Sequence, residues 1–305
     1  MIRALATAIV LGSSGLAHGQ TPSPPEQEPV EQEPAQVEDV IVNGRSLEQL
    51  STRFVNEVAQ PTLRWRGLAR WFGPVCIGVA NFRRDTAQHI ADSLATIGGQ
   101  MGVPINDGAC SPNVLVIGAT DSRAVAAEWA RTRGWAFHRD GSQGVGRPST
   151  LEWFTDADVP VRWWHVSAPM YVDQMTGRVG RGNQPYVIAK SQLWPRRRAD
   201  LQQITIIVDV DRVEGVTVDQ LCSYLAMLAF SQVDPEADTS GFDSILNLFK
   251  GPDSPGGLSV WDRAYLTSMY AAPEDRRLSS GDQARGLTSV LRAEEAGPTA
   301  VAEPR

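Results

Sequence analysis

The sequence predicts an α+β domain, in which a mixed sheet is backed by helices and followed by a helical C-terminal subdomain. Up to residue 231, short apolar runs typical of buried strands alternate with helix patterns. The strongest strand pattern covers 204–210, where almost every residue is β-branched. After residue 231 only short helix patterns follow. A single domain is therefore expected over residues 46–293.

The N-terminal part of this domain alternates helix and strand patterns. Ser46 is the expected N-cap of a helix that ends near Val58. Residues 85–101 carry apolar side chains at spacings of three and four, which is typical of an amphipathic helix. A helix is also expected over 121–131 and a glycine-rich loop over 141–146. The expected strands cover 74–82, 113–117, 159–167 and 186–191.

The helix after the strongest strand is the most apolar in the chain. Thr217 is its expected N-cap, and it runs to residue 231 with Leu221, Tyr224, Leu225 and Leu228 on one face. Short helices are expected over 242–249, 258–270 and 281–291. No internal repeat is evident in the sequence.

The ends of the chain have the composition of an export signal, a linker and a tail. Arg3, the apolar run 4–16 and the small residues around Ala17 and Gly19 predict a signal peptide over residues 1–19. Residues 20–45 form an acidic linker rich in Pro, Glu and Gln, which is expected to be disordered, as is the tail 294–305. The mature protein is therefore expected to be periplasmic or secreted.

The linker ends in a segment, 38–45, that is similar to the one near the N-terminus of TonB-dependent outer-membrane receptors. No barrel of alternating strands follows it, so the sequence excludes a receptor of that class. Whether the segment docks on the domain or on another protein stays open.

Charge and hydropathy exclude two classes of function. The net charge is −7, and it becomes −8 when Arg3 leaves with the signal peptide. This balance argues against a general nucleic-acid or anionic-membrane binder, because both need a basic surface. No apolar stretch of the mature chain is long enough to span a bilayer. The basic triplet 196–198 is expected to be a solvated turn.

Three cysteines are placed in different surroundings. In an oxidising compartment two accessible cysteines tend to pair, so we expect a disulfide between Cys76 and Cys110. Cys222 lies within the apolar helix 217–231 and is expected to remain a buried thiol.

No complete catalytic motif is present. His89, His138 and His165 are isolated in sequence, and neither a zinc-binding pair of histidines nor a Gly-x-Ser-x-Gly turn occurs in the mature chain. Asp209 and Asp211 are expected to end their strand in solvent. We therefore assign no catalytic, metal-binding or cofactor-binding residue and expect no cofactor.

Two later segments carry a family resemblance. Residues 243–247, Asp-Ser-Ile-Leu-Asn, are similar to the segment around the methionine turn of metzincins, with Leu246 in place of the methionine. Residues 258–270 resemble the metzincin terminal helix, and the preceding order of strands and helices looks like the upper subdomain of zincin metallopeptidases. The chain also resembles uncharacterised exported bacterial proteins that are labelled as peptidases.

The resemblance implies a zincin-like fold without zincin chemistry. In that family the helix at 216–233 carries His-Glu-x-x-His, but here it contains neither His nor Glu. The leading hypothesis is a non-catalytic domain that binds a peptide or protein partner in the cell envelope. One alternative is a hydrolase of unfamiliar type, for example with Tyr224 beside Asp209 or His165. A structural envelope protein is another.

Overall fold

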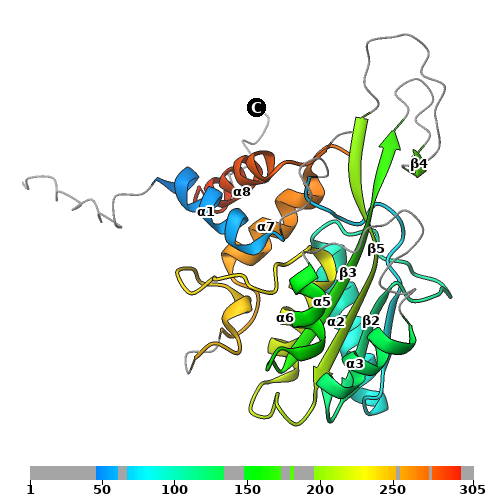
Figure 1. Cartoon of the computed structure of the whole chain (residues 1–305). Coiled ribbons are helices and arrows are strands. Elements are labelled where there is room, and N and C mark those ends of the chain that lie inside the picture. Colours follow the sequence, from blue (N-terminus) through cyan, green and yellow to red (C-terminus); the bar gives the residue numbers. More distant parts are fainter. Residues whose placement is uncertain are drawn as a thin grey trace, which may run out of the picture. The chain divides into compact units, whose positions relative to one another are not determined.

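A computed structural model describes most of the domain (Figure 1). The described residues are 46–60, 67–133, 148–172, 179–181, 196–251, 255–274 and 277–296, and all belong to one unit, Arg45–Arg305. The expected signal peptide, linker, loop 141–146, strand 186–191 and His138 lie outside these residues, as does the end of the tail from 297.

Within the described residues the strands form one five-stranded mixed sheet, in the order β1-β2-β5-β3-β4. Strands β1, β2 and β5 are parallel, whereas β3 runs antiparallel to both β5 and β4. This sheet and its helices confirm the predicted α+β class. The bounds are β1 Ile77–Ala80, β2 Val114–Ala119, β3 Val161–Val172, β4 Val179–Arg181 and β5 Arg196–Asp209.

Helices cover both faces of the sheet. Alternate residues of β3 point to opposite faces, so Val161 and Trp163 join the main core with α6, whereas Trp164 and Val166 join a smaller core with α3 and α5. Helix α2 packs against α6 on the main-core side. The bounds are α2 Arg84–Gln100, α3 Ser122–Thr132, α5 Pro148–Asp156 and α6 Val218–Phe230.

The remaining helices form a group beside the sheet (Figure 1). These are α1 Leu47–Val58, α7 Val260–Ala271 and α8 Ser280–Glu295, and α8 packs on both of the others. The ring of Phe54 on α1 contacts those of Phe242, Trp261 and Tyr265. The buried guanidinium of Arg70 donates to carbonyl oxygens at the C-terminal end of α7 and so caps that helix. The helical C-terminal part is thus anchored to the segment that precedes β1.

Helix starts follow the sequence signals closely. Helices α1, α6, α7 and α8 each begin with a capping box, whose N-caps are Ser46, Thr217, Ser259 and Ser279. The expected caps Ser46 and Thr217 are confirmed. Among the described helices, none combines the length and apolar character that crossing a bilayer requires.

The predicted disulfide is confirmed. Cys76 and Cys110 are bridged, with their Cα atoms 6.0 Å apart, and Cys222 is a free, buried thiol. Burial raises the pKa of the Cys222 thiol above its ordinary value, which disfavours the reactive thiolate.

Several expected boundaries were wrong. Strands β3 and β5 are longer than expected, α5 was not expected, and a short 3-10 turn, η1 Ile245–Asn247, stands where a helix over 242–249 was expected. The basic triplet is not a solvated turn, because it begins β5. There Arg198 pairs with the buried Asp200 at 2.9 Å and lies over the ring of Phe72, which shields its charge from solvent.

Candidate functional site

One cavity of the described part of the chain lies beside α6, between the start of β3, α5 and the segments that follow α6. Its volume is about 390 Å³, within the range of small-ligand sites. Most of its lining is apolar, with four charged residues. The lining comprises Trp153, Asp158, Val159, Pro160, Val161, Trp163, Arg212, Tyr224, Val233, Asp234, Pro235, Ala237, Leu246, Phe249 and Lys250. We call this space the aromatic cavity.

A chain of aromatic rings shapes this cavity. Ring centroids lie 4.7 Å apart between Trp153 and Trp163, 6.5 Å between Trp163 and Tyr224, and 5.0 Å between Tyr224 and Phe249, all in edge-to-face arrangements. The indole N–H of Trp163 also donates to the carbonyl of Val233 at 3.2 Å. These contacts hold rings from α5, β3, α6 and the segment after η1 in fixed relative positions.

Tyr224 is the residue of α6 that most clearly faces this cavity with a polar group. Burial raises the pKa of its phenol above the ordinary value. The phenol is therefore neutral at physiological pH and does not supply a general base.

The main chain beside the cavity is covered. Among the described strands, β3 pairs with β5 alone over 161–168, and β4 pairs with β3 at 170–172. This edge of β3 is nevertheless buried, because Val161 and Trp163 are only 1% and 5% exposed. Trp153 of α5 packs against both core clusters, so α5 reaches around this edge of the sheet. An extended peptide cannot add here as another strand, because that needs free N–H and C=O groups.

The charged residues of the cavity differ in the hydrogen-bond and ion-pair partners that they contact. Arg212 donates to Asp158 at 2.7 Å in an exposed ion pair. Asp234 accepts from the main-chain N–H of Glu236 at 3.0 Å. Lys250 donates to two neutral oxygens, the carbonyl of Ala237 at 2.6 Å and the hydroxyl of Thr239 at 3.5 Å. Burial lowers the pKa of Lys250, although the charge of Asp238 opposes this.

One wall of the cavity rests on a buried carboxylate. Asp262 accepts from the Ser244 hydroxyl at 2.7 Å, the Ile245 N–H at 2.7 Å and the Ser259 N–H at 2.9 Å. Burial raises the pKa of Asp262, and these donors oppose the shift. The same carboxylate thus starts α7 and holds η1, whose Leu246 lines the cavity.

The described histidines do not converge on a metal site. His89 pairs with Asp219 at 2.8 Å on the surface, whereas buried His165 bonds to the carbonyl of Leu228 at 2.8 Å. Within the described part of the chain, no group of three or more His, Cys, Asp or Glu side chains is placed to hold a metal ion.

Tyr224 and Asp209, two of the residues suggested for an unfamiliar hydrolase, are not brought together. Tyr224 lies in the main core, whereas Asp209 accepts from the N–H of Ser122 on α3, across the sheet, at 3.3 Å. Asp209 is only 6% exposed, so its expected solvated position was wrong. The ring of His165 bonds to the main chain of α6, and the ring contacts of Tyr224 are with Trp163 and Phe249.

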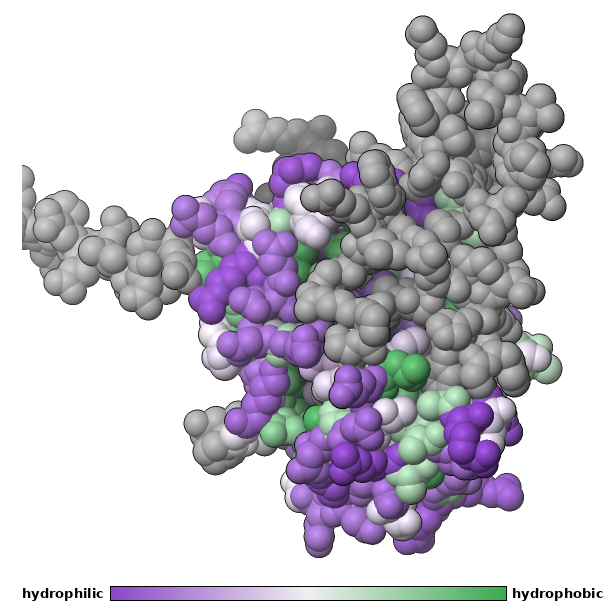
Figure 2. Space-filling view, in the orientation of Figure 1, coloured by the Kyte–Doolittle hydropathy of each residue, from purple (hydrophilic) through white to green (hydrophobic). Residues whose placement is uncertain are grey.

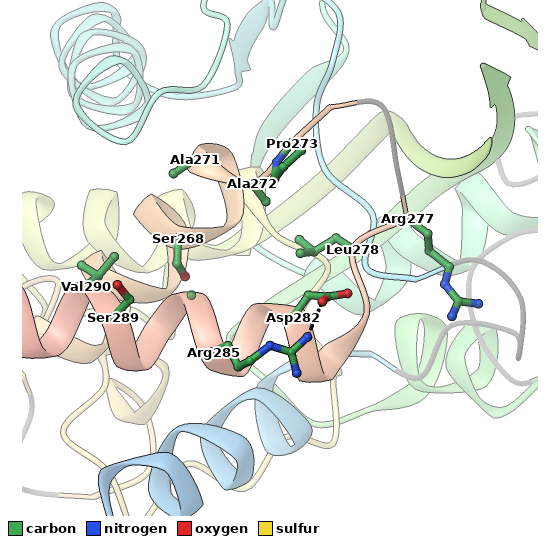
Figure 3. Close-up of a pocket in the computed structure, with 11 residues that line it drawn as sticks. Ser268, Ala271, Ala272, Pro273, Arg277, Leu278, Asp282, Arg285, Ser289 and Val290 are labelled. Atoms are coloured by element: carbon green, nitrogen blue, oxygen red, sulfur yellow. Dashed lines mark hydrogen bonds and ion pairs between the residues drawn. The ribbon is translucent and has the colours of Figure 1, made fainter. Parts of the chain in front are cut away.

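A second cavity, of about 320 Å³, lies between α7 and α8 (Figure 3). Its walls are mainly small residues such as Ala271 and Ala272. Arg285 is paired with Asp282 at 2.5 Å, and Figure 3 shows Arg277 pointing away from that pair. Because its charged groups do not converge, this cavity is a weaker candidate.

On the face of the molecule that Figure 2 shows, the described residues are mostly hydrophilic, with hydrophobic ones in small areas. Comparisons with protein-family models, curated proteins and solved structures find no match for the chain. The candidate site is therefore assigned from its geometry.

Buried His165 should make stability depend on pH. Burial lowers its pKa from 6.5 to about 4, so between these values the unfolded chain binds a proton that the folded one does not. The free energy of unfolding should fall by about 3 kcal/mol as the pH drops from 6.5 to 4. Urea unfolding measured across this range checks the slope.

A pair of histidine variants isolates the effect. His165→Gln keeps an N–H donor for the Leu228 carbonyl but cannot titrate, so it should remove most of this slope. His89→Gln is the matched control for the loss of an imidazole, because His89 is half-exposed and pairs with Asp219 on the surface. Equal slopes in wild type and His165→Gln would contradict the assignment.

Proposed function

We propose that this protein is an exported, non-catalytic, zincin-like protein that binds a peptide or protein partner in the aromatic cavity. The observation that carries this is the position and lining of the cavity. It lies beside α6, the helix that the resemblance equates with the zincin metal-binding helix. From α6 it receives the neutral phenol of Tyr224, where a metallopeptidase would present histidines and a glutamate.

Other parts of the fold support the same proposal. Helix α6 follows the long strand β5, η1 packs against α6, and Leu246 of η1 lines the cavity where the metzincin turn would carry its methionine. The antiparallel strand β3 also begins beside the cavity, which Val161 and Trp163 line. This arrangement retains a binding space without the ligands and base that zinc hydrolysis needs.

Peptide selection tests the proposal. The chain from residue 20 is immobilised, peptides are selected from a displayed random library, and their affinities are measured by tryptophan fluorescence. Because Trp153 and Trp163 line the cavity, occupancy should change the emission. Phe249→Ala removes one ring of the lining and should weaken binding at least tenfold.

Phe82→Ala is the matched control. Phe82 is partly buried against the same core but does not line the cavity, so its removal should leave the affinity within about twofold. Failure to select any peptide, or an equal loss in both variants, would contradict the proposal. Cleavage of a selected peptide, followed by mass spectrometry, would instead favour the hydrolase alternative.

A further inference from the structure

We propose that the aromatic cavity receives the carboxy-terminal residue of a peptide, with a large apolar side chain among the rings and the α-carboxylate on Lys250. This inference rests on the proposed function, because it names the ligand of the same cavity. It starts from two features of the site: one cation that contacts no acidic side chain among the described residues, and a covered strand edge.

The charges of the cavity single out Lys250. Arg212 and Asp158 neutralise each other, whereas among the described residues the Lys250 ammonium donates to the oxygens of Ala237 and Thr239 alone. Nearby Asp238 is engaged by Ser240, through its hydroxyl at 2.6 Å and its N–H at 3.1 Å. An incoming carboxylate would give the ammonium an ionic partner at the edge of an apolar site.

Lys250 also differs from almost all other cationic residues of the chain in being a lysine. The chain has 26 arginines and only two lysines, Lys190 and Lys250. An arginine fork matches both oxygens of a carboxylate, whereas a lysine is a compact, strongly hydrated charge with rotatable donors. Lys250 can therefore keep its bond to Ala237 while it donates to a second oxygen.

The covered edge determines how much of a peptide can enter. Every residue of β3 from 161 to 168 is buried, so an extended peptide finds no accessible main chain to pair with beside the cavity. A cavity of about 390 Å³ lies near the lower end of ligand-site volumes. A chain terminus needs no exit path and brings an apolar side chain and a charge in one residue.

Matched synthetic peptides test the inference on the chain from residue 20. The probes are N-acetylated hexapeptides of identical sequence ending in phenylalanine, as free acid and as C-terminal amide, and a free acid ending in alanine. Tryptophan fluorescence should show the phenylalanine acid binding at least tenfold more tightly than its amide. The alanine acid should bind at least tenfold more weakly than the phenylalanine acid.

Substitutions at the two cations assign the carboxylate contact. Lys250→Met should abolish the difference between acid and amide without changing the affinity for the amide, and Lys250→Arg should preserve part of the difference. The double variant Asp158→Asn/Arg212→Met removes the other cation together with its acidic partner and should leave the preference intact. Loss of the preference in this double variant but not in Lys250→Met would overturn the assignment to Lys250.

The outcomes separate the inference from the proposed function. Equal binding of acid and amide, still weakened by Phe249→Ala, would overturn carboxy-terminal recognition and leave peptide binding in place. If library-selected peptides bind but none of the three probes does, carboxy-terminal recognition is likewise overturned and peptide binding remains in place. If neither the library nor the probes bind, both the inference and the proposed function are wrong.

Discussion

Asp262→Ala should lower the free energy of unfolding by about 3–5 kcal/mol, among the largest losses that one substitution in this domain can cause. The carboxylate is fully buried and accepts from the hydroxyl of Ser244 and the N–H groups of Ile245 and Ser259. Removing it leaves these donors buried without a partner, at about 1–3 kcal/mol each, with partial relaxation. Urea unfolding followed by circular dichroism measures the loss.

Asp282→Ala provides a matched control. Asp282 has the same third position in the capping box of α8, but it is only partly buried. Solvent can replace the lost contacts there, so the expected cost is about 1 kcal/mol. Losses of similar size in the two variants would show that burial of Asp262 does not set the cost.

The Asp262 network connects stability to the proposed site. The carboxylate positions η1, and η1 places Leu246 in the wall of the aromatic cavity. A conservative Asp262→Asn variant that still folds should therefore bind selected peptides more weakly, even though residue 262 does not line the cavity.

Local signals in the sequence were sufficient for much of the fold. Capping residues such as Ser46 and Thr217 predicted helix starts, since a side-chain oxygen that satisfies free N–H groups acts within one turn. The β-branched run 204–210 predicted the central strand β5, and apolar spacing predicted α2. These features depend on neighbours in sequence, so no knowledge of tertiary contacts was needed.

Buried charges could not be predicted in this way. Arg162 is almost fully buried because its guanidinium donates to the carbonyls of Phe154 and Ala157 and to the hydroxyl of Ser122. These partners come from α3 and from α5 with the residue that follows it. The same holds for Asp209, which was expected to lie in solvent but accepts a hydrogen bond from the N–H of Ser122 on α3. Such burial depends on partners that only the folded chain supplies.

The candidate site was predictable only in part. Sequence reasoning named Tyr224 of the helix 217–231 in an alternative hydrolase site, but it named none of Trp153, Phe249 and Lys250. Their rings and charge come from segments far apart in the chain, and α5 itself follows a glycine-rich stretch that favoured a loop. A signal was available in the scarcity of lysine, since one of only two lysines lies at the cavity.

Removing the disulfide with the double variant Cys76→Ser/Cys110→Ser should lower the free energy of unfolding by about 3–4 kcal/mol. The bridge joins residues 34 apart in sequence, and closing a loop of this length restricts the unfolded chain by that amount in the chain-entropy model. The native loop should survive, because Val75 donates to Pro104, and Asn113 bonds to Cys76 through both its N–H and its side-chain oxygen. Spectra of the folded state should therefore be nearly unchanged while the urea midpoint falls.

Reductant supplies the internal control for this prediction. It should lower the urea midpoint of the wild-type protein to that of the double variant and leave the double variant unaffected. Cys222→Ala removes a thiol that is free and buried, so that variant should keep its full sensitivity to reductant. If reductant leaves the wild-type midpoint unchanged while the double variant is destabilised, the loss arises from the serine substitutions in the folded state. Constraint of the unfolded chain by the bridge would then be the wrong explanation, because breaking the bridge without substitution must release the same chain entropy.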